Sequence, residues 1–146
     1  MRTVASLLQS ALKINIPAQV ELSFYDSTDE YIRLQKEQLS EGLLNDGEQI
    51  YNVKTGSFQY SPGYAKYKGK SEPIDLRDTG DFYGGINIER QSQGSFKIES
   101  DDDKNAMLQK DYGKAIFGLA DERLQSFASV AKAKLASNIT DELNRV

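Results

Sequence analysis

The sequence of 146 residues contains neither cysteine nor histidine. Without cysteine the chain can form no disulfide and no thiolate metal site, and it has no thiol nucleophile. Without histidine it has no imidazole general base, no Ser-His-Asp triad and no imidazole metal ligand. These two absences exclude much hydrolytic chemistry, and the lack of cysteine fits assembly in a reducing compartment.

Long hydrophobic runs and an excess of positive charge are also missing. The N-terminal stretch MRTVASLLQSALKINI is interrupted by Gln9, Ser10 and Lys13, so it lacks the apolar core of a signal peptide and is too short to span a bilayer. The net charge is −4 and the pI is about 4.9, which gives the whole molecule no electrostatic attraction for duplex nucleic acid. We therefore expect a soluble protein that is not exported.

What is present is an ordinary globular composition, with 38% hydrophobic and 27% charged residues. A chain of this length usually forms one domain and buries roughly two thirds of the surface that its unfolded form exposes. We find no internal repeat and no low-complexity linker. Residues 1–146 are therefore predicted to form a single domain.

The N-terminal part of the chain predicts two helices separated by an extended segment. Hydrophobic residues fall on one side of a helix over residues 2–13. A proline and an alternation of apolar with polar residues predict an extended segment over 15–24. A second helix is predicted over 27–43, with a capping box formed by Ser27 and Glu30 at its start.

Residues 48–75 are rich in tyrosine, lysine, glycine and serine and show no sustained periodicity. We expect a long, locally basic loop at about 48–73. Its segment 51–70 is expected to be mobile in the free protein and to become ordered on assembly. Its tyrosines would stack nucleic-acid bases in a single-strand-binding domain, or would supply rigid amphipathic area to a protein partner. The acidic charge of the chain favours the protein partner. The candidate interface residues are Tyr51, Tyr60, Tyr64, Lys66, Tyr67 and Lys68.

The second half of the chain predicts a β-hairpin and two further helices. Residues 86–91 and 95–100 alternate with period two, and Gly94 supplies a positive φ angle in the turn between them. Residues 101–113 predict a short helix ending at Gly113, followed by KAIFGL as a hydrophobic connector.

From Ala120 onward, hydrophobic residues repeat every three or four positions, which predicts a long amphipathic helix. Its stripe of Leu124, Phe127, Ala131 and Leu135 is expected to be buried against the sheet. The predicted fold class is α+β, with a small antiparallel sheet formed by the β-hairpin, packed against the long C-terminal helix, and additional N-terminal helices.

The stretch LRDTGDFYGGI at 76–86 resembles a phosphate-binding loop only superficially. A P-loop requires a lysine followed by serine or threonine, and the dinucleotide fingerprint requires a preceding strand and another glycine spacing. We favour a structural corner in which Asp78 or Thr79 caps a short helical turn while Phe82 and Tyr83 pack inward. The corner residues are Leu76, Thr79, Gly80 and Phe82.

Acidic residues leave an enzymatic alternative open. Mg²⁺-dependent nucleases of the restriction-enzyme type use one aspartate, followed later by an acidic residue and a lysine that are one residue apart. Asp75 or Asp78 would supply the first carboxylate, and Asp102 and Lys104 the pair. DDDK at 101–104 is also typical of a solvated acidic helix start, which is the interpretation we favour.

Five segments, taken in their order, resemble the virion morphogenesis proteins of tailed phages and prophages. They are EQLSEGLLNDGEQI (37–50), YSPGYAKYKGK (60–70), IDLRDTGDFYGGINIE (74–89), FKIESDDDKNAMLQKDYG (96–113) and AIFGLADERLQSF (115–127). The family pattern places a leucine before a threonine-glycine turn, then a hairpin, a tyrosine-glycine pair, a hydrophobic segment and a C-terminal helix. The matching residues are Leu76, Thr79, Gly80, Tyr112, Gly113 and Phe117–Leu119.

This resemblance to tail-completion and neck proteins implies a structural protein and not an enzyme. Such a subunit forms a ring that terminates the tail or takes part in head-tail joining. The implied partners are further copies of the chain and tail-tube or head-tail connector proteins, with no membrane, cofactor, metal or small-molecule substrate. The implied location is the virion of a bacteriophage or prophage, assembled in the cytoplasm of the bacterial host.

Overall fold

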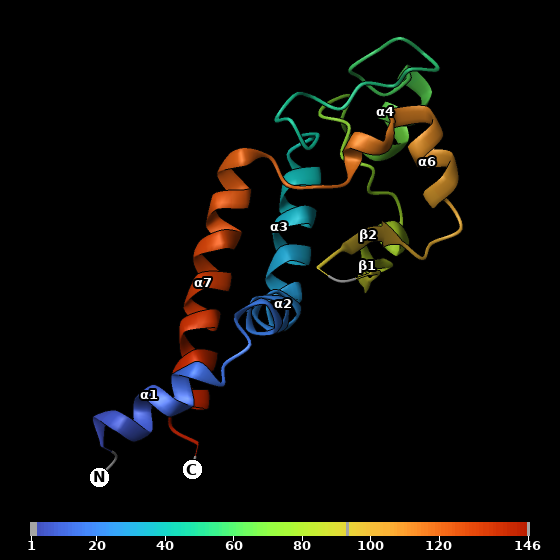
Figure 1. Ribbon diagram of the computed structural model, residues 1–146. Helices are drawn as coiled ribbons and strands as arrows, with labels where there is room; N and C mark the ends of the chain where they lie inside the picture. Colours follow the sequence, from blue (N-terminus) through green and yellow to red (C-terminus); the bar gives the residue numbers. More distant parts are fainter. Residues whose placement is uncertain (1–2, 93, 146) are drawn as a thin grey trace.

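Figure 1 shows the computed structural model, which describes residues 3–92 and 94–145. The molecule is elongated, with both termini and α1 at one end and α4 and α6 at the other (Figure 1). In chain order the elements are α1 (Val4–Leu12), α2 (Ile16–Asp26), α3 (Thr28–Ser40), α4 (Pro62–Lys68), α5 (Asp81–Gly84), β1 (Ile86–Arg90), β2 (Phe96–Ser100), α6 (Asn105–Tyr112), the 3-10 turn η1 (Lys114–Ile116) and α7 (Asp121–Leu143).

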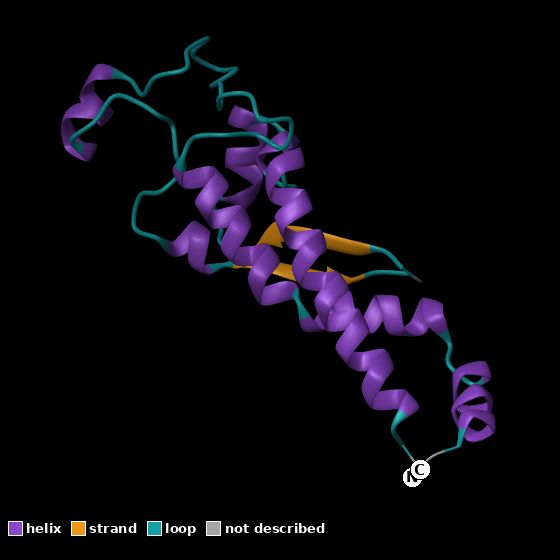
Figure 2. Ribbon diagram, turned by 90° about the vertical axis from the view of Figure 1, so that its left-hand side faces the viewer, coloured by secondary structure: helices purple, strands orange, loops and turns teal. Residues whose placement is uncertain are grey.

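The predicted α+β class is confirmed. Strands β1 and β2 form an antiparallel hairpin in which Ile86 pairs with Ser100 and Arg90 with Phe96. Gly94 has the positive φ angle (69°) expected for the turn. Figure 2 shows the hairpin lying beside the helices at the middle of the molecule. Within the described ranges, no helix combines the length and apolarity needed to cross a membrane.

The prediction of an extended segment over 15–24 is wrong, because these residues form most of α2. The side chain of Asn15 caps this helix by accepting a hydrogen bond from the Ala18 amide (3.1 Å). Pro17 lies in the first turn, where a missing N–H breaks no helical hydrogen bond. The residues that suggested a strand do not share a buried face, since Val20 and Leu22 are exposed.

The predicted capping box at Ser27 is also wrong. The Ser27 hydroxyl donates to the Ser23 carbonyl of α2 (2.7 Å), and the Glu30 carboxylate binds Arg33 (2.6 Å). Ser27 therefore closes α2 and precedes α3 at the same time, so that the two helices meet with one residue between them.

Two hydrophobic clusters form the core, and α3 contributes to both. The larger cluster contains Leu39, Ile50, Ile74, Leu76, Phe82, Tyr83, Ile86, Ile116 and Phe117. The smaller contains Leu34, Leu119 and Phe127, with Phe24, Tyr31 and Ala131 packed against it. Helix α3 is thus the element on which the two halves of the molecule are assembled.

An aromatic group connects the hairpin to the C-terminal helix. The Phe24 ring lies 4.2 Å from the Phe96 ring and 5.3 Å from the Phe127 ring, between centroids. Tyr31 approaches Phe127 edge-on at 5.1 Å. Of the predicted buried stripe, Phe127 is 4% exposed, whereas Leu124 is 45% exposed and so does not belong to the core.

The segment predicted as a hydrophobic connector is held by two buried glutamines of α3. Gln35 donates to the Ile116 carbonyl (3.1 Å) and accepts from the Gly118 amide (2.8 Å). Gln38 repeats this pairing two residues later, with the Gly118 carbonyl and the Ala120 amide (both 2.8 Å). The two amide side chains therefore pair the Ile116 carbonyl, both backbone groups of Gly118 and the Ala120 amide, which would otherwise be buried without partners.

We expect Phe127→Ala to lower the free energy of unfolding by about 3–5 kcal/mol, because it removes a buried ring that contacts two other rings. Chemical denaturation checks the value. The control is Leu124→Ala on the same helix, which should change stability by less than about 1 kcal/mol because Leu124 is exposed. Equal losses in the two variants would contradict the described packing of α7.

Candidate functional site

The region expected to be a long loop contains a helix. In α4, the Ser61 side chain accepts from the Tyr64 amide (3.4 Å), Pro62 occupies the first turn, and Gly69 ends the helix with a φ angle of 86°. Serine, then proline, then a closing glycine are ordinary helix boundary signals. They were missed because the seven residues between them show no apolar period.

The carboxylate of Asp75 is the centre of the polar contacts in this region. Lys68 and Lys70 each place Nζ 2.7 Å from one of its oxygens. The Tyr60 hydroxyl donates to Asp75 Oδ1 (3.0 Å) and accepts from the amides of Asp75 and Leu76. Asp75 is buried, so these partners replace the water that a carboxylate would otherwise bind.

Two further aromatic contacts enclose this centre. The Tyr83 hydroxyl donates to the Asp75 carbonyl (2.6 Å), and the Arg77 guanidinium lies over the Tyr83 ring at 5.5 Å. Lys68 lies over the Tyr60 ring at 5.3 Å and also donates to the Arg77 carbonyl. Burial raises the pKa of both the Tyr60 and the Tyr83 phenol, so these hydroxyls keep their protons and act as neutral donors.

The six candidate interface residues therefore divide into two groups. Tyr60 and Lys68 have their polar groups engaged with Asp75 inside the subunit. Tyr67 is 76% exposed, Lys66 is exposed, and Tyr51 is partly exposed with its ring 4.9 Å from Phe58. Tyr64 lies between the groups, since its ring contacts both Tyr60 (4.8 Å) and Tyr67 (5.9 Å).

The LRDTGDFYGGI stretch contains α5 and leads directly into β1. Phe82 and Tyr83 are buried, as expected, and Leu76 is buried with an unusual positive φ angle of 58°. The prediction that Asp78 or Thr79 caps this turn is wrong, because Gly80 occupies the N-cap position of α5 with a φ angle of 94° and no side chain caps the helix. Thr79 accepts from the Asp81 amide at 3.3 Å, so it supports the turn from one residue earlier.

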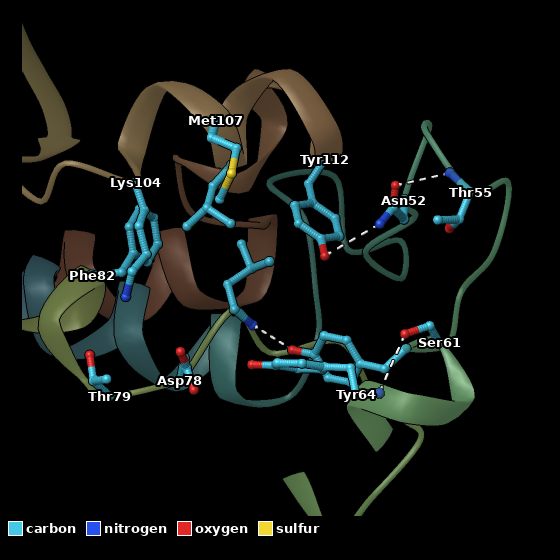
Figure 3. A pocket seen from close by; sticks show the side chains of 13 residues that line it. Asn52, Thr55, Ser61, Tyr64, Asp78, Thr79, Phe82, Lys104, Met107 and Tyr112 are labelled. Atoms are coloured by element: carbon cyan, nitrogen blue, oxygen red, sulfur yellow. Dashed lines mark hydrogen bonds between the residues drawn. The ribbon is translucent and has the colours of Figure 1, made fainter. Parts of the chain in front are cut away.

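A cavity of about 440 Å³ lies between this corner, α4 and α6 (Figure 3). Leu76, Phe82 and Leu108 supply apolar lining, and Asp78 and Lys104 add opposite charges. Its other lining residues are Asn52, Thr55, Tyr60, Ser61, Tyr64, Thr79, Met107 and Tyr112. The size is that of a small-molecule pocket or of a recess for one or two partner side chains.

The nuclease residues are only partly brought together. Asp78 and Lys104 line the cavity, whereas Asp102 accepts from the Lys104 amide (3.2 Å) just before α6. The Asp75 carboxylate is already paired with two lysines. Between residues 3 and 145, leaving out residue 93, no three acidic side chains are grouped so as to hold a metal ion.

No family model, no curated protein and no solved structure matches the chain.

The contacts of the Asp75 carboxylate with Lys68 and Lys70 should make the stability of the protein depend on pH in the acid range. Burial acts to raise the pKa of the Asp75 carboxyl, but hydrogen bonds from Lys68 and Lys70 outweigh it and hold the pKa below the ordinary value. The resulting stabilisation is present above the pKa of the unfolded chain, about 3.9. It is lost as the pH falls through the lower folded-state pKa.

We therefore expect Asp75→Asn to be less stable than the wild type at pH 7. We also expect this variant to lose less stability than the wild type when the pH is lowered. Denaturant midpoints at pH 7 and at pH 3 measure both effects. Asp46→Asn, at an exposed turn, is the control. A pH dependence unchanged in Asp75→Asn would show that the carboxylate is not stabilised by these contacts.

Gly80 allows a second test of the corner. Gly80→Ala should cost about 1–2 kcal/mol, because its positive φ angle is unfavourable for a residue with a Cβ atom. Gly84→Ala is the matched control, since a Cβ atom at either glycine would meet nothing within 4 Å and Gly84 lies in α5 with a helical backbone. Thermal melts that rank the two variants in the opposite order would contradict the geometry at Gly80.

Proposed function

We propose that this protein is a structural subunit of the tail-completion or neck class from a tailed phage or prophage. In this proposal it forms a ring that terminates the tail or joins it to the head. One observation carries the proposal. Leu76 and Phe117, two of the residues on which the resemblance to that family rests, are buried in one core cluster, and a third, Tyr112, packs against it.

Leu76, Phe82 and Phe117 belong to one buried cluster, and Tyr112 packs against it. The Phe82 and Phe117 rings lie 5.9 Å apart. These residues come from segments separated by up to 41 positions, which fits motifs that specify a shared architecture.

Gly113 and Gly118 support the same interpretation. Their φ angles of 89° and 104° turn the chain on either side of η1 and the Phe117 segment. The Gly118 backbone is paired with Gln35 and Gln38 of α3. Glycine is required here for backbone shape, and its role is therefore structural.

The face that would contact tail-tube or connector proteins is the exposed side of α4. Tyr67 and Lys66 extend from it, and the row of rings from Tyr67 through Tyr64 to Tyr60 continues into the Asp75 centre. Tyrosines that are packed at their base and exposed at their tip supply rigid contact area at interfaces.

The test is carried out in a host that produces the phage particles. Disrupting the gene should give filled heads and complete tails that do not join, and the wild-type gene supplied separately should restore joining. The double variant Tyr67→Ala with Lys66→Glu should reduce the yield of joined particles without lowering the thermal midpoint. Val130→Ala with Lys132→Glu, on the exposed side of α7, is the matched control.

Normal infectious particles in the absence of the protein would overturn the proposal. The enzymatic alternative predicts another result, namely divalent-dependent DNA cleavage that is lost in Asp78→Asn and Lys104→Ala. Salt-dependent binding of oligonucleotides at micromolar concentration would favour a single-strand-binding domain instead.

A further inference from the structure

Helix α1 is hydrophobic but has no buried residue. Val4, Leu8 and Leu12 follow one another at intervals of four and are 74%, 60% and 86% exposed. That spacing places them on one side of the helix. A helix of nine residues is only marginally stable in water on its own. Figure 1 shows α1 at the end of the molecule, beyond α2 and beside the last turns of α7.

Helix α1 lacks charged residues, as the cores of protein interfaces do. Residues 3–12, TVASLLQSAL, contain no charged residue, in a chain of which 27% is charged. Solvent-exposed helices normally carry charges on their outer face, and the cores of interfaces are depleted of them. The exposed side of α1 is therefore suited to an apolar, uncharged surface.

The same chain offers such a surface between α2 and the end of the hairpin. A groove of about 560 Å³ there is lined mainly by apolar residues, namely Pro17, Ala18, Val20, Phe24 and Phe96. Its two charged residues, Glu21 and Arg90, pair with each other at 2.7 Å. The groove therefore presents no unpaired charge that would require a charged partner.

The dimensions of the two surfaces agree. At about 1.5 Å per residue, α1 is roughly 14 Å long, and the part of α2 that lines the groove, from Pro17 to Phe24, spans roughly 12 Å. Helix α1 does not fill the groove of its own chain. Only residues 13–15 connect it to α2, and it lies against α7 instead.

We propose that α1 of one subunit docks into the groove between α2 and the hairpin of a second copy. The two contacting surfaces are different parts of the same chain, so the contact is head-to-tail. Repetition of a head-to-tail contact produces a ring when the rotation closes. This inference rests on the proposed function for the ring, and it identifies the surfaces through which neighbouring subunits bind.

The absence of cysteine makes a direct test possible. Leu8→Cys and Val20→Cys are introduced in separate chains, which are mixed at high concentration under mild oxidation. We expect a disulfide between the two chains in clear excess over a mixture of Leu8→Cys with Leu124→Cys. Leu124 is the matched control, because its exposure (45%) is close to that of Val20 (48%).

Equal yields in the two mixtures would overturn the inference. The same holds if a chain that carries both Leu8→Cys and Val20→Cys forms the bond only within itself, because α1 would then cover its own groove.

A second measurement separates this inference from the proposed function. Leu8→Glu with Leu12→Glu should abolish association in sedimentation velocity and stop joining of heads and tails, with an unchanged thermal midpoint. Leu124→Glu should leave both unaffected. Rings and joined particles that persist in the double variant would overturn the α1 contact but leave the proposed function standing. A wild-type protein that neither associates nor takes part in joining would overturn both.

Discussion

The contacts of the buried Asp75 carboxylate hold together the end of the molecule that contains α4 and the corner before the hairpin. The two lysines that bind Asp75 and the Tyr60 hydroxyl come from the α4 region, while the Asp75 backbone carbonyl receives the Tyr83 hydroxyl from α5. A buried charge is tolerated only when its partners are all in place. The α4 segment and the corner before the hairpin are therefore positioned together, and the cavity lies between them and α6.

Helix α3 has the corresponding role for the C-terminal part. Gln35 and Gln38 bind the backbone of the 116–120 segment, and Leu34 packs with Leu119 and Phe127. The segment thus leaves α6 and enters α7 along a path defined by hydrogen bonds as well as by apolar packing. Because α7 also packs on α2, the direction of the N-terminal helices is coupled to the same frame.

The hairpin and α7 were predictable because their periodicities of two and of three to four extend over enough residues. The inward packing of Phe82 and Tyr83 was predictable because the glycines and the threonine around them define a turn. Helix α2 was not, since its apolar residues are largely exposed and follow no helical stripe. The Asp75 centre and the pairing of Gln35 and Gln38 were also missed. They join residues 5 to 83 positions apart, and neither pairing follows a helix or strand periodicity. The same limit explains why only some of the predicted interface tyrosines lie at the surface.

The single residue between α2 and α3 has a geometric consequence for the proposed ring. Ser27 is buried, and its hydroxyl is bound to the Ser23 carbonyl, so the bend between the two helices is held from inside the protein. In the proposed contact, α1 and the α2 side of the groove precede this bend in the chain, and Phe24 at the end of that side also packs against the smaller core cluster. In the proposed ring, the angle at Ser27 then contributes to the direction in which one subunit meets the next.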